Sequence, residues 1–271
     1  MKNRLISLCL LCACCVMAKA DDLKLWYKQP AKVWTEALPL GNSRLGAMVY
    51  GGVVNEQIQL NEETVWGGGP HRNDSPKALG VLPTVRELLF SGREKEAEKM
   101  IADNFFTGQH GMPFQTIGSL MLEFDGHADY SDYRRELDLE KAIASVRYKI
   151  GEVNYIRTVF TSLADNALIV RIEADKPGAV NFTTRYSTPY KEYEIKKNGK
   201  SLLLSGHGSA HEGIPGAIRF ETRTQIKAEK GKVNVTSDCI EVKGADAAVI
   251  YVTAATNFVN YKDVSANETR R

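Results

Sequence analysis

One stretch of the chain concentrates side chains that could do chemistry. Asn61, Glu62, Glu63 and Trp66 stand within six residues of one another, directly before three consecutive glycines at 67–69. Glycine permits positive φ angles and lets a backbone approach other groups closely. An amide, two carboxylates and an indole beside such a turn would suit the recognition of a sugar or of another protein domain. The same residues also fit an ordinary strand and turn with a partly buried tryptophan, because short motifs match by chance often.

Carboxyl pairs that could act as acid and base are not evident. Glu62 and Glu63 are adjacent, so on a strand they would point to opposite faces and could not flank one bond. Two further pairs are spaced two residues apart, which places side-chain origins about 6.5–7 Å apart on one face. These pairs are Glu123 with Asp125, and Glu136 with Asp138. Such pairs are common on exposed strand faces, and we interpret them as solvated.

Metal, cofactor and nucleophile signatures are also missing. The histidines His71, His110, His127, His207 and His211 stand apart in the sequence, without the paired spacing of a ligand set. There is neither a GxSxG elbow nor a GxxxxGK[ST] loop. We therefore predict no metal, no cofactor and no catalytic residue in this chain.

The first twenty residues are typical of a secretory signal peptide. Lys2 and Arg4 precede an apolar run at 5–17, and small residues at 18–20 offer a cleavage site. Residues 11–14 (LCAC) could instead be read as a lipoprotein box, but cysteine at the second position is atypical. We expect a secreted or periplasmic protein, and nothing after residue 20 is apolar enough to cross a membrane.

Removal of this segment changes the composition. Four of the five cysteines leave with it, so Cys239 has no partner for an intramolecular disulfide. Cys239 is then best interpreted as a small buried apolar side chain. The 35 basic residues fall to 32 against 33 acidic ones, and the absence of a basic stripe excludes a nucleic-acid-binding role.

Most of the remaining chain alternates apolar and polar residues at period two, which indicates strands with one buried face. Turns are predicted at Gly151 and at Asn198-Gly199. Helical spacing occurs only at 84–90 and 94–105, where Ala97, Met100, Ile101 and Phe105 form an apolar stripe. The predicted fold is an all-β, large antiparallel β-sandwich (a super-sandwich) with a short helical insertion. Ten strands are expected, at 45–50, 57–60, 120–124, 142–150, 153–161, 167–173, 180–186, 218–226, 233–235 and 247–253.

Several ordered motifs resemble one known family. They are EALPLGNSRLGAMV at 36–49, QLNEETVWGGGP at 59–70, VRELLFSG at 85–92, FQTIGSL at 114–120, YRRELDL at 133–139 and NFVNYKD at 257–263. Together they are similar to the N-terminal domain of glycoside hydrolase family 95, the inverting α-L-fucosidase family, over nearly the whole chain after the signal peptide. Ser43 replaces a glycine of that pattern, and Ser119 stands where many relatives carry an acid.

The resemblance implies an N-terminal β domain that is followed by a helical linker and a catalytic (α/α)6 barrel. The barrel would supply the general acid and the residues that activate water, so this chain alone is expected to be inactive. The expected organisation is a signal peptide at 1–20, the β-sandwich at 21–256 and the start of a linker at 257–271. Trp66, His110, Gln115 and Asn61 are the candidates for an edge that faces the barrel or a fucosylated glycan. Two alternatives stay open: a stand-alone carbohydrate-binding module, or a purely structural sandwich that holds a partner domain.

Overall fold

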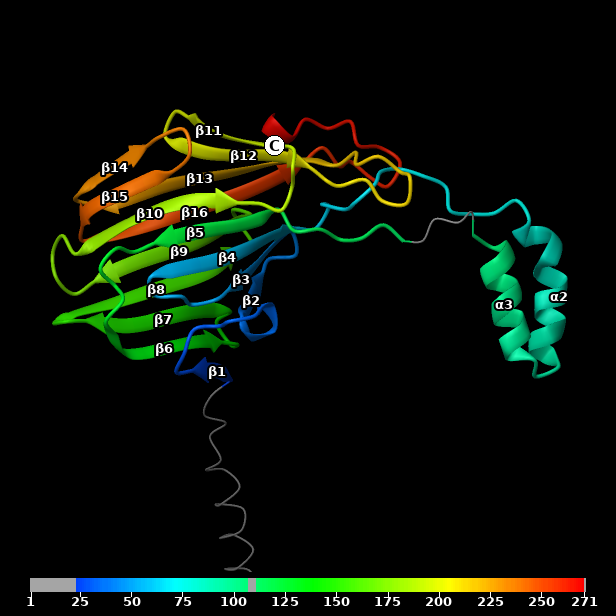
Figure 1. Cartoon of the computed structure of the whole chain (residues 1–271), viewed down its shortest axis with the longest axis horizontal. Coiled ribbons are helices and arrows are strands. Elements are labelled where there is room, and N and C mark those ends of the chain that lie inside the picture. The colour runs from blue at the N-terminus through cyan, green and yellow to red at the C-terminus, as the bar shows by residue number, and fades with distance from the viewer. Residues whose placement is uncertain (1–22, 107–110, 271) are drawn as a thin grey trace, which may run out of the picture.

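The computed structural model describes residues 23–106 and 111–270. Two antiparallel sheets pack face to face, and a hairpin of two helices stands away from them (Figure 1). The predicted all-β sandwich with a helical insertion is confirmed. Within the described residues neither helix combines the length and the apolar character that a membrane span requires.

The larger sheet has nine strands in the order β1-β6-β7-β8-β9-β16-β13-β12-β11. Their bounds are β1 Lys24–Tyr27, β6 Tyr130–Asp138, β7 Ile143–Ile150, β8 Val153–Ser162, β9 Ala167–Ala174, β11 Tyr193–Asn198, β12 Ser201–His207, β13 Arg219–Glu229 and β16 Ala247–Thr256. The smaller sheet has seven strands in the order β14-β15-β10-β5-β4-β3-β2. Their bounds are β2 Leu38–Gly41, β3 Leu45–Val49, β4 Asn55–Glu62, β5 Gly118–Glu123, β10 Val180–Ser187, β14 Lys232–Val235 and β15 Ile240–Ala245.

The alternation of apolar and polar residues explains most of these strands. In β4 every second residue from Glu56 to Glu62 is buried, and the residues between them are partly exposed. The predicted turns are confirmed, because Gly151 joins β7 to β8 and Gly199 joins β11 to β12, each with positive φ. Six strands were not among the ten expected: β1, β2 and β11 form sheet edges, and β6, β12 and β15 each lie next to an edge strand.

The core lies between the sheets. Ile58 and Leu120 of the smaller sheet and Leu168 and Ile250 of the larger one belong to a single cluster of buried apolar side chains. Burial of a large apolar side chain contributes about 1.5–3 kcal/mol, so this cluster is the main stabilising element. Cys239 is buried at 9% exposure, as the sequence suggested.

One buried ion pair crosses between the sheets. Nη1 of Arg157, on β8, lies 2.9 Å from Oε2 of Glu56, on β4, and both side chains are at most 2% exposed. Nη2 of Arg157 donates to the carbonyl of Gly52, and the N–H of Gly51 donates to Glu56 Oε1 at 2.7 Å. The pair therefore fastens the turn before β4 to the opposite sheet.

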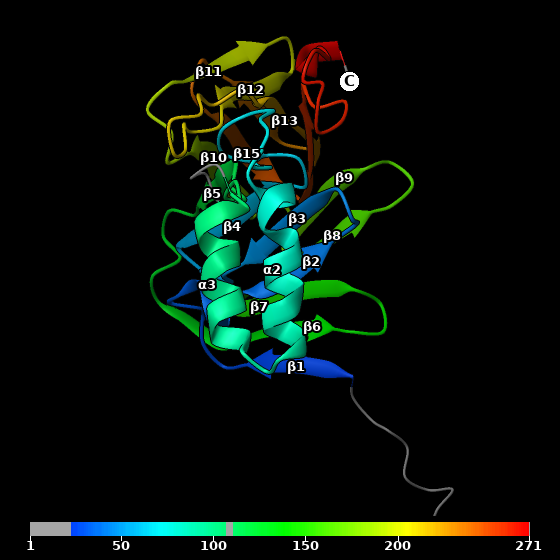
Figure 2. The same cartoon turned by 90° about the vertical axis from the view of Figure 1, so that its right-hand side faces the viewer.

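The helical hairpin, here called the arm, consists of α2 (Ala78–Phe90) and α3 (Glu94–Asn104). Figure 2 looks onto the arm, where the two helices lie side by side in front of one end of the sandwich. The predicted start of the first helix at residue 84 was wrong, because the helix continues through Pro83, which lacks a donor but keeps a helical φ. The predicted apolar stripe packs on Val85 and Leu88 of α2. The arm thus has its own small core.

Candidate functional site

Trp66 and Gln115 lie together at the end of the sandwich from which the arm projects. Trp66 forms an isolated antiparallel bridge with Phe114, and the two ring centroids are 5.2 Å apart. The N–H of Gln115 donates to the carbonyl of Val65 at 2.9 Å, and its side-chain Oε1 accepts from the N–H of Ser209 at 3.0 Å. Trp66 is 41% exposed, so it sits at the surface.

The other two predicted site residues are placed differently. Asn61 is half-buried in β4, opposite Gly46 of β3, on the face that points away from the core. His110 lies outside the described residues. The structure therefore brings Trp66 and Gln115 together, whereas Asn61 belongs to the outer surface of the smaller sheet.

Tight packing around the turn after Trp66 leaves little room for a side chain at the three glycine positions. The N–H of Gly67 donates to Pro113 at 2.9 Å, and that of Gly68 donates to Ser209 at 2.8 Å. Gly68 has a φ of +63°, and a Cβ at any of the three positions would come within 3.0 Å of a neighbouring side chain. The glycine turn is thus hydrogen-bonded to both the loop before β5 and the loop between β12 and β13.

Glu62 has a structural role. Its side chain is fully buried and accepts from Arg44 Nη2 at 2.7 Å and from the N–H of Thr64 at 2.7 Å. The hydroxyl of Thr64 also contacts that of Thr256, on β16 of the opposite sheet, at 2.5 Å. Glu63 lies just past the end of β4 and contacts the same guanidinium, with Oε1 3.1 Å from Arg44 Nη1. Because only Glu62 belongs to β4 and both carboxylates contact Arg44, the predicted placement of the two acids on opposite faces of a strand is not confirmed.

In the motifs at both ends of the domain, asparagine side chains stabilise turns by hydrogen bonds. Asn42 Oδ1 accepts from the N–H of Leu45 at 2.8 Å, across Ser43, whose φ of +76° explains why a glycine suits that position. Asn257 is fully buried; its side-chain amide donates to the carbonyls of Ala217 and Val264 at 2.9 and 2.8 Å. These two asparagines fix the backbone and are not available to a ligand.

An apolar recess of about 250 Å³ opens beside Trp66. Its lining residues come from the glycine turn, the loop before β5, the start of β13 and the segment after β16. They are Trp66, Gly67, Gly68, Gly69, Pro70, His71, Met112, Ile218, Phe258, Tyr261 and Val264. The sequence motifs at 59–70 and 257–263 contain Trp66, the glycines, Pro70, Phe258 and Tyr261, but only Trp66 and the glycine turn were predicted to belong to a functional surface.

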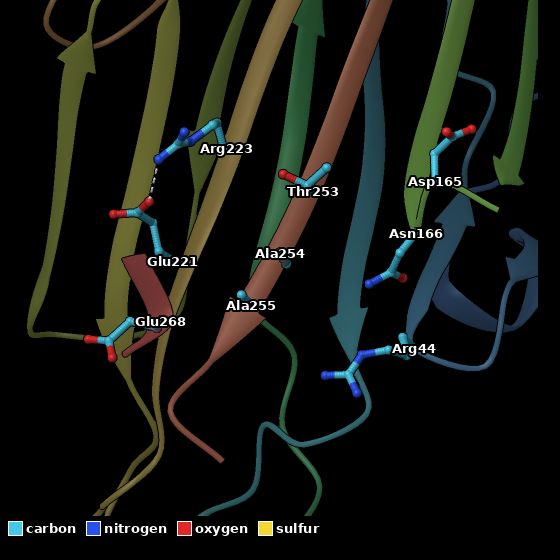
Figure 3. Close-up of a pocket in the computed structure, with 9 residues that line it drawn as sticks. All are labelled: Arg44, Asp165, Asn166, Glu221, Arg223, Thr253, Ala254, Ala255 and Glu268. Atoms are coloured by element: carbon cyan, nitrogen blue, oxygen red, sulfur yellow. Dashed lines mark hydrogen bonds and ion pairs between the residues drawn. The ribbon is translucent and has the colours of Figure 1, made fainter. Parts of the chain in front are cut away.

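A larger polar groove of about 580 Å³ lies across β16 (Figure 3). Thr253, Ala254 and Ala255 form its floor, with Glu221, Arg223 and Glu268 on one side and Arg44, Asp165 and Asn166 on the other.

The acids of this groove already have partners. Glu221 pairs with Arg223 at 3.0 Å, and Glu268 pairs with Arg219 at 3.0 Å. Burial is the largest influence on Glu268 and tends to raise its pKa, but the hydrogen bonds from Arg219, a backbone hydrogen bond and the charge of Arg219 together hold the pKa below its usual value. A general acid needs a raised pKa, so Glu268 is unsuited to that role.

His127 serves a structural purpose. His127 is buried, with Nδ1 3.1 Å from the Tyr148 hydroxyl, and burial followed by the charge of Arg157 lowers its pKa. Within residues 23–106 and 111–270, no three His, Cys, Asp or Glu side chains gather in a way that could hold a metal ion.

A protein-family model described as "Glycosyl hydrolase family 65, N-terminal domain" matches residues 25–261. The chain belongs to this family. The number in that description differs from the family 95 that the motifs resemble, but the curated relatives of this glycosyl hydrolase N-terminal domain are named as fucosidases, in agreement with the motifs.

Three curated relatives are similar to this domain along most of its length. "Alpha-L-fucosidase 2" of Arabidopsis thaliana is 33% identical over 87% of this chain and 30% of its own. "Probable alpha-fucosidase A" of Aspergillus niger is 30% identical over 94% of this chain and 33% of its own. The protein of the same name from Aspergillus oryzae is 26% identical over 93% and 35%. The chain therefore spans about a third of the length of the relatives it matches.

Proposed function

We propose that this chain is the non-catalytic N-terminal domain of a glycoside hydrolase that cleaves α-L-fucosidic bonds in glycans. The observation that carries the proposal is its similarity to three proteins named as fucosidases, each about three times as long as the matched part. A catalytic region of the length that remains in those relatives would supply the reacting groups.

The geometry of this domain supports a positioning role. Inverting hydrolysis uses two carboxyl groups roughly 6.5–9.5 Å apart, one of them an acid with a raised pKa. Burial raises the pKa of Glu56, but that side chain is at most 2% exposed and paired with Arg157. Two acids of the polar groove are held in ion pairs, and the third, Asp165, accepts a hydrogen bond from the Ser162 hydroxyl at 2.7 Å. The end surface around Trp66 and Gln115 is then the face proposed to meet the catalytic region.

Hydrolysis of a nitrophenyl α-L-fucoside tests the proposal. The isolated chain is expected to release no nitrophenol above the buffer rate, whereas a chimera in which it replaces the matched third of the Arabidopsis relative is expected to hydrolyse the substrate. Turnover by the isolated chain that disappears in Glu268→Gln, but not in the control Glu229→Gln, would contradict the proposal. A folded but inactive chimera would also count against it.

We also propose that the protein is exported after cleavage of residues 1–20, on the basis of the basic start and apolar run described above. Mass spectrometry of the mature N-terminus is expected to find Asp21 as the first residue. A lipid-modified Cys14 or Cys15 would instead establish a membrane anchor.

A further inference from the structure

The recess beside Trp66 has the properties of a docking pocket for a protein side chain. We propose that it receives one large apolar side chain, aromatic or branched, from the region that follows this N-terminal domain in the longer fucosidases. The identity of that partner rests on the proposed function, whereas the chemistry of the occupant rests on the pocket itself.

The lining selects an apolar occupant. Met112, Ile218, Phe258 and Val264 surround the recess together with the rings of Trp66 and Tyr261. At about 250 Å³ the recess is smaller than the roughly 300–1,000 Å³ of pockets that hold drug-sized ligands. A single anchoring side chain is the occupant that matches this size.

A sugar matches the lining poorly. The indole N–H of Trp66 already donates to the carbonyl of Glu63 at 2.9 Å, and Nδ1 of His71 lies 2.9 Å from the carbonyl of Gly69. A sugar carries several hydroxyl groups, and each one that is buried without a partner costs free energy. An apolar side chain has no such cost.

The pocket is formed in advance. Trp66 is fixed by its hydrogen bond to Glu63 and by its ring contact with Phe114. The glycine turn that forms one wall is held by backbone hydrogen bonds from Gly67 and Gly68 to two other loops. Pre-organised pockets lose little conformational freedom on binding, and binding energy concentrates where Trp and Tyr line such pockets.

The surroundings show that the partner must be large. Phe114 is 48% exposed beside the recess, and the arm at the same end exposes Leu79 at 79% and Phe90 at 89% (Figures 1 and 2). A stable interface covers about 800 Å² on each partner, far more than one side chain. The relatives, of which this chain covers only 30–35%, contain enough further chain to cover such a surface.

Nuclear magnetic resonance of the ¹⁵N-labelled chain tests the pocket without the partner. The probe is N-acetyl-tryptophanamide, with methyl α-L-fucoside as the competing class. The chain has three tryptophans, so the indole signals of Trp26 and Trp34, 49% and 55% exposed, are internal controls. We expect a saturable shift of the Trp66 indole signal alone, with a Kd on the order of 1 mM.

Matched variants then assign the site. Tyr261→Ser, at a side chain that is 74% exposed, is expected to weaken probe binding at least about tenfold without unfolding the chain. Tyr130→Ser, at an exposed tyrosine of β6, is expected to leave it unchanged.

Three outcomes would overturn the inference: no shift of the Trp66 signal at 20 mM probe, equal shifts of all three indole signals, or a saturable shift with methyl α-L-fucoside but not with N-acetyl-tryptophanamide. The last outcome would identify a carbohydrate-binding module. If the probe binds but the chimera is inactive, the proposed function would be refuted, whereas the inference of an apolar docking pocket would be retained.

Discussion

Replacing Arg157 by methionine is expected to be among the most destabilising single changes in the sandwich. The substitution leaves Glu56 buried without its cationic partner, and the loss of one member of a buried ion pair costs about 3–5 kcal/mol. A chain of this size loses about 2–4 °C of Tm per kcal/mol, so Tm should fall by roughly 6–20 °C. Methionine keeps much of the volume, which limits any contribution from a cavity.

The pH dependence of the stability loss in Arg157→Met tests whether the unpaired charge of Glu56 is its cause. Burial raises the pKa of Glu56, and the charge of Arg157 partly opposes that rise. Without Arg157 the pKa rises further above its unfolded value. A group with a raised folded pKa loses its stabilising contribution as pH climbs through that pKa. The deficit of Arg157→Met relative to wild type should therefore be larger at pH 8 than at pH 5.

Thermal unfolding followed by circular dichroism measures the fall in Tm, and urea unfolding at pH 5 and pH 8 measures the pH dependence. The matched control is Arg185→Met, since that side chain is 43% exposed and pairs at 3.0 Å with Glu123, which is 40% exposed, so its loss should cost less than about 1 kcal/mol. Adding Glu56→Gln to Arg157→Met should recover part of the stability, because both buried charges are then gone. Equal losses for Arg157→Met and Arg185→Met, or no pH dependence, would refute this reasoning.

Three further changes have defined outcomes. Gly68→Ala, at a φ of +63°, should destabilise the chain by about 1–3 kcal/mol, whereas Gly80→Ala, in open space on α2, should stabilise it by about 0.5–1 kcal/mol in the same thermal assay. Asn257→Ala removes three hydrogen bonds and should speed proteolysis of 257–270, as peptide mapping would show. The hydrogen bond that the His207 ring donates to Glu192 raises the pKa of His207, so its stabilising contribution is present below pH 6.5 and lost above the raised pKa. Glu192→Gln should lower the pKa of His207 in an NMR titration.

Local patterns predicted the parts of this protein that depend on neighbouring residues. Period-two alternation identified the central strands, such as β4, in which every second residue from Glu56 to Glu62 is buried. The position of Trp66 after a strand indicated a surface location, and its exposure agrees. A role for Trp66 and Gln115 in meeting a partner stays a prediction.

The start of the first helix and several edge strands required the tertiary structure. Helical spacing was expected only from residue 84, directly after Pro83, yet the helix begins at Ala78 because packing of α2 on α3 outweighs the missing donor of Pro83. Strands β1 and β11 carry little burial and so lack the alternation that marks a central strand. Their pairing with β6 and β12 is what makes them strands.

The sequence by itself determined the all-β class, the helical insertion and the family motifs, since each depends on residues that are close along the chain. Only the tertiary structure decided that Glu56 meets Arg157 and that Trp66, Met112 and Tyr261 enclose one recess. These groups are separated by about fifty to two hundred residues, and their meeting depends on how two whole sheets pack. No local period encodes that packing, because it is set by side-chain volume and burial across the sandwich.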